Sequence, residues 1–211
     1  MTLIWLNGPF GGGKTQTAHE LSRRLPGSVV CDPEHAGFGL RRMLPPALRG
    51  DFQDLTSWRT AVVEVLHLAL RQNRGPVIAP MTVIEPTYFE ETVDRLRTMG
   101  HEVHHFSLLA RRETVLKRLR ERGFGHVLQL LAGKDAPLRR DSWAVSKLDI
   151  CLERLQDKQF AEHVWTDTLP VREVADHIAK TVGVTLRPNR DGPVGGYLRR
   201  SWTSVKHIRF D

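Results

Sequence analysis

The chain has 211 residues, 40% of them apolar, and a formal net charge of +7. A chain of this length is expected to form one domain with a buried core, and it contains no run of about 20 apolar residues that could span a membrane. The first residues resemble a strand and not a signal peptide. Its two cysteines, Cys31 and Cys151, lack metal-site spacing, so we expect a cytoplasmic protein.

The positive charge is concentrated near the C-terminus. Residues 186–211 carry six basic and two acidic side chains, and therefore account for +4 of the net charge. Prolines and a Gly-Gly pair separate this segment from the preceding helical pattern. We therefore predict a domain over 1–185 and a basic tail over 186–211. A basic tail suits an anionic membrane surface, a nucleic acid, or solubility alone.

Strands and helices are predicted to alternate along the first 185 residues. Short apolar runs predict strands at 2–7, 28–31, 77–81, 102–109 and 163–166. Apolar residues at helical spacing predict helices at 15–25, 55–72, 85–99, 113–122, 142–155 and 171–182. Residues 35–50, rich in Gly, Pro and Arg, are expected to be irregular or weakly helical. The alternation predicts an α/β fold, a parallel five-stranded sheet flanked by helices.

A glycine-rich loop joins the first predicted strand to the first predicted helix. Its sequence, Gly8-Pro-Phe-Gly-Gly-Gly-Lys-Thr15, matches G-x-x-x-x-G-K-[ST] at every fixed position. Glycines let backbone N–H groups turn towards phosphate oxygens, the lysine ammonium neutralises the β- and γ-phosphates, and the Thr15 hydroxyl coordinates Mg²⁺. We predict ATP and Mg²⁺ as cofactors. The predicted nucleotide-binding residues are Gly8, Gly11, Gly12, Gly13, Lys14, Thr15 and Gln16.

Other motifs narrow the class of phosphate-loop protein. The chain lacks the Asn-Lys-x-Asp motif with which GTPases read their base, and the Leu-Ser-Gly-Gly signature of transporter ATPases. The third predicted strand ends Ala-Pro-Met-Thr, without the paired acids usual in mechanical ATPases. What remains is a P-loop NTPase fold with the layout of a small-molecule kinase: an N-terminal phosphate loop and a late arginine-rich lid, at about 118–143.

The catalytic candidates beside Lys14 are one acid and two arginines. Asp32 follows the second predicted strand, at the sheet edge where ligands bind, and could accept the proton of an attacking hydroxyl. The alternative for Asp32 is a turn residue before Pro33. Arg118 and Arg122 are four residues apart on a basic helix, so they share a face and could close over the transferred phosphate. The alternative for both arginines is a solvated helix face.

Acceptor contacts are predicted between the second and third strands. Arg41 and Arg59 suit an anionic or hydrogen-bonding acceptor, and Trp58 lies nearby. The alternatives are surface arginines and a tryptophan in the core. Elsewhere, His104 and His105 alternate across a strand, so one of them at most faces the site, and a lone strand histidine is usually structural.

The motifs together resemble the tunicamycin resistance protein family. The resemblance rests on the phosphate loop with its flanks, 5–17, followed in order by Asp32-Pro-Glu, Gly37-Phe-Gly-Leu-Arg41, Trp58-Arg59, Pro80-Met-Thr82, His104-His-Phe106, Ser142-Trp-Ala144 and Lys206-His-Ile-Arg209. It covers nearly the whole chain, with a longer segment between Gly123 and Asp141. It implies an ATP-binding protein related to kinases of antibiotics and nucleosides, resistance to tunicamycin, and membrane attachment through the C-terminal segment.

The tail itself allows two interpretations. The spacing of Leu198, Trp202, Val205 and Ile208 predicts one stripe of a basic amphipathic helix. Such a stripe suits an anionic membrane surface, or packing against the protein's own sheet or a partner.

Our leading hypothesis is ATP-dependent transfer of phosphate to a hydroxyl of a small molecule, which would confer resistance to a tunicamycin-type nucleoside antibiotic. The alternative is an ATP-binding protein, peripheral at the inner face of the membrane, that sequesters the antibiotic without modifying it. A nucleic-acid-binding ATPase rests on charge alone and is disfavoured. The oligomeric state stays open.

Overall fold

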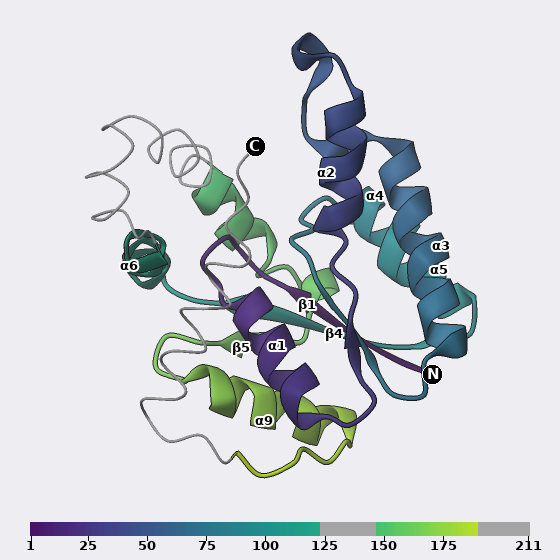
Figure 1. Ribbon diagram of the computed structural model, residues 1–211. Helices are drawn as coiled ribbons and strands as arrows, with labels where there is room; N and C mark the ends of the chain where they lie inside the picture. Colours follow the sequence, from purple (N-terminus) through teal and green to yellow (C-terminus); the bar gives the residue numbers. More distant parts are fainter. Residues whose placement is uncertain (123–146, 190–211) are drawn as a thin grey trace, which may run out of the picture.

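The structure is a computed structural model, and it describes residues 1–122 and 147–189. Its centre is a parallel five-stranded sheet in the order β2-β3-β1-β4-β5 (Figure 1). The strands are β1 (Thr2–Asn7), β2 (Val29–Val30), β3 (Val77–Pro80), β4 (Glu102–Leu109) and β5 (His163–Trp165). The predicted α/β fold of the P-loop class is confirmed, and the strand bounds agree to within two residues.

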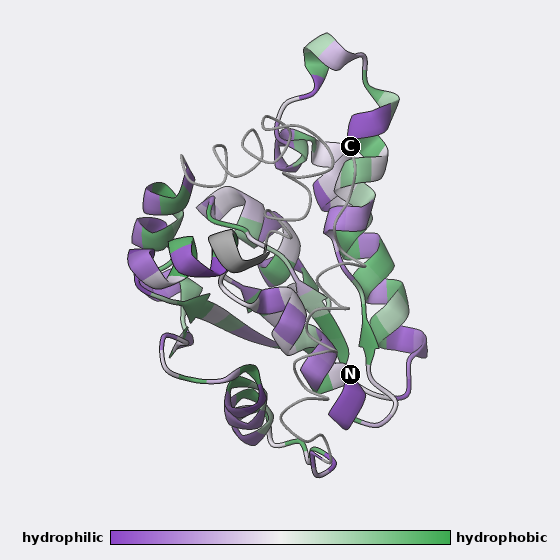
Figure 2. Ribbon diagram, turned by 60° about the vertical axis from the view of Figure 1, so that its left-hand side comes forward, coloured by the Kyte–Doolittle hydropathy of each residue, from purple (hydrophilic) through white to green (hydrophobic). Residues whose placement is uncertain are grey.

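Helices cover both faces of this sheet (Figure 1). One face packs against α1 (Lys14–Arg24) and α9 (Val171–Val182), and the other against α3 (Thr56–Gln72) and the helical run after β3. Within β1, Ile4 and Leu6 join the α1 side while Leu3 and Trp5 join the α3 side. Because β1 is buried on both faces, it is a continuous apolar run. In Figure 2 the strands are largely green, the colour of hydrophobic residues, whereas the helices carry both green and purple residues.

The remaining elements frame the carboxyl edge of the sheet or connect its layers. They are α2 (Glu34–Met43), α4 (Pro86–Phe89), α5 (Arg95–Thr98), α6 (Arg112–Arg122), a helical segment at 147–154, and four short helices of other types. Three of these are 3₁₀ turns, η1 (Pro46–Leu48), η2 (Phe52–Asp54) and η4 (Lys158–Phe160), and the fourth is the π-helical η3 (Glu90–Asp94). No helix in the described ranges is long and apolar enough to cross a membrane.

Two local predictions differ from the structure. Residues 34–43 form the regular helix α2, although the sequence suggested irregular or weakly helical chain. A Cβ at Gly37 would lie 2.4 Å from Cδ2 of Phe52, so this glycine permits close packing inside a helix and does not break it. The predicted helix 85–99 is interrupted by η3, because its ladder widens to the π pattern at Glu90–Asp94.

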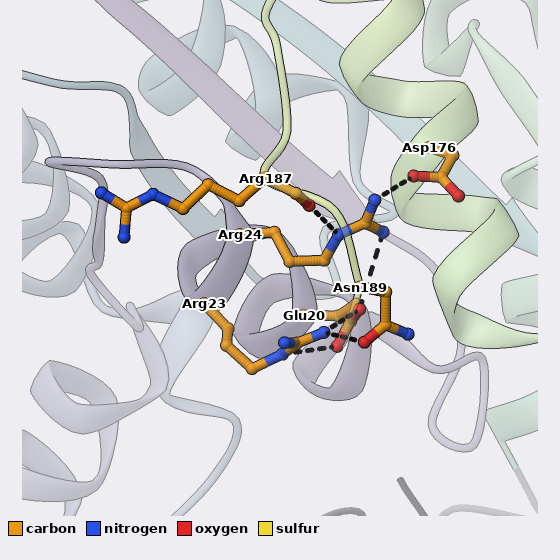
Figure 3. Close-up of polar contacts among 6 residues, drawn as sticks. All are labelled: Glu20, Arg23, Arg24, Asp176, Arg187 and Asn189. Carbon is orange, nitrogen blue, oxygen red and sulfur yellow. Dashed lines mark hydrogen bonds and ion pairs between the residues drawn. The ribbon is translucent and has the colours of Figure 1, made fainter. Parts of the chain in front are cut away.

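The chain after α9 stays attached to α1 as far as Asn189, beyond the predicted domain end at 185. Arg24 and Arg187 exchange two hydrogen bonds: Nε of Arg24 donates to the Arg187 carbonyl at 2.9 Å, and the Arg187 amide donates to the Arg24 carbonyl at 2.7 Å. Arg24 also pairs with Asp176 at 2.7 Å, and Arg23 binds Asn189 at 2.9 Å (Figure 3). This network ties α1, α9 and the start of the basic segment together.

Arg24→Met is expected to destabilise the protein by about 1–3 kcal/mol, because it leaves the Arg187 carbonyl and Asp176 without their donor. In a domain of this size that corresponds to a fall in Tm of about 2–10 °C by thermal unfolding. The matched control is Arg23→Met, which removes the more exposed pairing with Glu20 and Asn189 and should cost less than about 1 kcal/mol. Equal losses in the two variants would contradict a structural role specific to Arg24.

Candidate functional site

The phosphate loop joins β1 to α1 and is shaped by its glycines. Gly8, Gly11 and Gly13 adopt positive φ angles of 143°, 82° and 97°. A Cβ at Gly8 would lie 2.6 Å from the Leu108 carbonyl oxygen, and one at Gly12 would lie 2.9 Å from that of Pro9. Larger residues would therefore strain the loop or force it away from β4.

The loop presents a positively charged lining. Lys14 is 7% exposed, and its Nζ donates to the carbonyl oxygens of Gly8 at 2.9 Å and Pro9 at 3.1 Å. Helix α1 begins at Lys14, and within the described chain no side chain caps it and no acid lies in its first turn. The first N–H groups of a helix have no partner inside the helix and carry partial positive charge. The lysine and the uncapped helix start together fit a phosphate group.

Asp32 lies at the same edge of the sheet, directly after β2. Its Oδ1 accepts a hydrogen bond from the Glu34 amide at 2.9 Å, which starts α2. Asp32 therefore has the turn role that the sequence analysis gave as its alternative. The same hydrogen bond orients the carboxylate and so sets the position of its second oxygen. Strand β3 lies between β1 and β2, so Asp32 is two strand spacings, about 10 Å, from the phosphate loop.

Arg118 clamps α6 onto the chain that follows β5. Its guanidinium donates to the Thr166 hydroxyl at 2.9 Å and to the Thr166 carbonyl at 2.5 Å. Asp167 accepts from the Arg111 amide at 2.9 Å and the Thr114 hydroxyl at 2.6 Å. Partial burial alone would raise the pKa of Asp167, but these hydrogen bonds and the charges of Arg111 and Arg118 outweigh it and lower the pKa.

Helix α6, which contains the start of the predicted lid, lies beside the phosphate loop. A Cβ at Gly11 would meet Val115 Cγ1 at 3.0 Å and Leu119 Cγ at 3.2 Å, so α6 packs directly on the loop. The contact of Arg118 with a transferred phosphate stays a prediction. The side chain of Arg122 and the lid residues 123–143 lie outside the described part of the chain.

The predicted acceptor residues lie at different depths. Trp58 is fully buried, and its Nε1 donates to the Pro33 carbonyl at 3.0 Å, so it packs α3 against the start of α2. Arg59 is 8% exposed and binds Glu91 and the Gln53 carbonyl, both at 2.5 Å. The two residues therefore connect α3 to neighbouring segments of the predicted acceptor region. Direct contact of either with an acceptor stays a prediction.

Arg41 lies in the last turn of α2 and is partly exposed. Its Nε is buried and has no hydrogen-bond partner among the described residues. A buried donor of this kind is costly unless a ligand or neighbouring group satisfies it. Contact of Arg41 with an acceptor stays a prediction.

His105 lies behind the loop, in β4, and is buried between aromatic rings. Its ring centroid is 4.8 Å from that of Phe89 and 6.4 Å from that of Phe160. Burial lowers the pKa of His105 to about 4, although its hydrogen bond to the Ala161 carbonyl acts in the opposite direction; the charges of Arg97 and His163 lower it further. The ring is therefore neutral at pH 7.

This burial predicts a loss of stability in acid. Between pH 6.5 and about 4 the unfolded chain binds a proton at His105 that the folded protein does not, so stability falls as the pH is lowered through this window. The contribution is fully present above pH 6.5 and amounts to at most about 3 kcal/mol. Urea unfolding of the wild type and His105→Gln at several pH values should show a shallower pH dependence in the variant. Parallel curves would contradict this assignment.

Comparisons with known proteins agree with this geometry. The chain matches the AAA domain family over residues 3–136. No curated protein matches it. The tunicamycin resistance protein of Deinococcus radiodurans is 35% identical, with a TM-score of 0.70, and the alignment covers 90% of this chain and 100% of that one. The chain belongs to the tunicamycin resistance protein family. This confirms the resemblance found in its sequence motifs.

Small-molecule kinases share the fold of this tunicamycin resistance family member at lower identity. A sugar kinase from Janibacter is 16% identical with a TM-score of 0.57, over 87% of this chain and 95% of that one. A gluconokinase from Sinorhizobium meliloti is 16% identical with a TM-score of 0.53, over 99% of this chain and 98% of that one. At this identity these likenesses show a shared fold.

Proposed function

We propose that this chain transfers a phosphoryl group from ATP to a hydroxyl of a small molecule, and that the acceptor is a nucleoside antibiotic of the tunicamycin type. The family membership and the kinase-like fold support the general activity. The single observation that carries the proposal is the uncapped start of α1 beside the buried Lys14, with Asp32 two strands away. These features supply a phosphate site and a carboxylate on one edge of the sheet.

The donor half of the site binds the triphosphate. The backbone of the glycine loop and the first turn of α1 surround phosphate oxygens, and the Lys14 ammonium, directed by the Gly8 and Pro9 carbonyls, neutralises the negative charge that builds up during transfer. Thr15, the second residue of α1, would place its hydroxyl on Mg²⁺. The ion, when bound, would supply positive charge that neutralises the phosphates.

The acceptor half uses Asp32. The acceptor oxygen attacks the terminal phosphorus, the bond from that phosphorus to the bridging oxygen breaks, and ADP leaves. The proton of the hydroxyl passes to the Asp32 carboxylate. The turn formed with the Glu34 amide fixes the orientation of Asp32.

The test is a mass-spectrometric assay with MgATP and a panel of acceptors containing tunicamycin, nucleosides and simple sugars. We expect a gain of one phosphoryl group on tunicamycin or a related nucleoside, together with an equal amount of ADP. Binding of ATP without a phosphorylated product from any acceptor would contradict transfer and favour the sequestering alternative. Transfer to sugars alone would contradict the proposed acceptor class.

A further inference from the structure

Gly8 is the first residue of the phosphate loop. Both its amide N–H and its carbonyl oxygen form hydrogen bonds with buried side chains. Its amide donates to Oδ1 of Asn7 at 2.9 Å. Its carbonyl accepts from the Thr82 hydroxyl at 2.7 Å and from Lys14 Nζ at 2.9 Å. The carbonyl that directs the catalytic lysine is therefore also bound by a residue that follows β3.

Asn7 uses every polar atom of its side chain. Oδ1 accepts from the amides of Gly8 and Val83, and Nδ2 donates to the Val83 carbonyl at 2.8 Å. The second contact of Nδ2 is His105 Nε2 at 3.2 Å. Two backbone N–H groups can point only at the oxygen, so these contacts fix the orientation of the amide. Asn7 thus links the end of β1 to the chain after β3 and to β4.

His105 completes the set because both of its ring nitrogens are engaged. Nδ1 lies 3.0 Å from the Ala161 carbonyl, which can only accept, so Nδ1 carries the hydrogen. Nε2 is then an acceptor for the Asn7 amide. Phe89 packs against the imidazole edge to face, which restricts its rotation. The neutral ring, in this single tautomer, therefore accepts a hydrogen bond from Asn7 and helps to fix the Asn7 side chain.

The three side chains bind the loop backbone and one another. Asn7, Thr82 and His105 are 0%, 6% and 5% exposed. A buried polar group without a hydrogen-bond partner is costly, so these three side chains have one favoured arrangement. In that arrangement the hydrogen bonds of Asn7 and Thr82 fix the position of Gly8. Because Gly8 in turn binds Lys14, a change in the set displaces both the loop and the lysine.

We propose that Asn7, Thr82 and His105 are positioning residues that set the phosphate loop and Lys14 for nucleotide binding. Thr82 takes the place in the sequence where mechanical ATPases carry acids after the third strand, and its hydroxyl serves the loop backbone. The inference rests on the nucleotide-binding half of the proposed function. It requires no particular acceptor.

The decisive experiment measures the Kd for MgATP of purified variants at a temperature where all of them are folded. Thr82→Val keeps the shape but removes the hydroxyl, and is expected to raise the Kd roughly five- to tenfold. Thr82→Ser restores the donor and should return the Kd to within about twofold of the wild type. His105→Phe keeps the aromatic contacts, removes the acceptor for Asn7, and should raise the Kd roughly tenfold.

Two controls separate positioning from general stability. His104→Phe alters the neighbouring residue on the opposite face of β4, and Leu70→Ala opens a cavity in α3 far from the loop. Leu70→Ala should lower the stability more than Thr82→Val does, yet both controls should leave the Kd within about twofold. A Kd that is unchanged in Thr82→Val and His105→Phe, or that follows stability across all variants, would overturn the inference.

The Kd values test the positioning role whichever acceptor the protein uses. A wild type that binds MgATP but phosphorylates nothing removes the proposed transfer, while the Kd values still decide the positioning role. Unchanged affinities with normal phosphoryl transfer remove the positioning role and leave the proposed function intact. A wild type that does not bind MgATP contradicts both.

Discussion

Lys14→Met is expected to reduce kcat/KM for phosphoryl transfer by roughly 10²–10³-fold, the usual effect of removing one donor to developing negative charge in a water-poor site. Methionine keeps the apolar stem of the side chain, which lies buried between the loop and α1, and removes the ammonium that binds the Gly8 and Pro9 carbonyls. Steady-state rates with varied ATP measure the effect.

The control for this substitution is Lys180→Ala, on the exposed side of α9. It removes one positive charge from the protein without touching the phosphate loop, so kcat/KM should change by less than about twofold. A similar loss in both variants would mean that the general positive charge of the protein, and not the position of Lys14, favours the nucleotide. Full activity in Lys14→Met would contradict the donor site.

Asp32→Asn is expected to reduce kcat by roughly 10²–10⁴-fold while the KM for ATP changes little, because it removes the proton acceptor and spares the phosphate loop. Asparagine retains an oxygen that can accept from the Glu34 amide, so the turn that starts α2 should survive. Steady-state kinetics with a fixed acceptor and varied ATP separates the two parameters. Circular dichroism checks that the fold is kept.

The neighbouring acid provides the matched control for Asp32. Glu34→Gln removes a charge within the first turn of α2 and should lower kcat by less than about threefold, since Glu34 follows the turn and is not its acceptor. If both variants lose activity equally, the loss comes from the changed negative charge of this region and not from removal of a specific general base. If Asp32→Asn keeps wild-type kcat, the role of Asp32 is confined to the turn.

The sheet and the donor loop could be predicted because their signals are local. An apolar run followed by Gly8 and the lysine motif identifies a strand, a loop and a helix within about 25 consecutive residues. The place of Asp32 also followed from strand direction alone, since the carboxyl ends of parallel strands meet at one edge. The order of the strands then sets its distance from the loop.

What could not be predicted depends on contacts between distant segments. Nothing near Thr82 in the sequence shows that its hydroxyl reaches Gly8, 74 residues earlier. The same holds for Arg118, whose partner Thr166 is 48 residues away. Residues 35–50 were expected to be irregular or weakly helical, because the contact of Gly37 with Phe52, which explains a glycine inside α2, is also tertiary. Spacing rules describe one element at a time, and these contacts form between elements.

The most direct test of phosphoryl transfer is the number of phosphorylated acceptor molecules formed per enzyme in a prolonged reaction with MgATP. We expect many molecules of product per molecule of wild-type protein, each matched by one ADP, and a product yield far below this for Asp32→Asn and Lys14→Met. Protection or binding that saturates at one acceptor per protein, with the acceptor recovered unmodified, would contradict it.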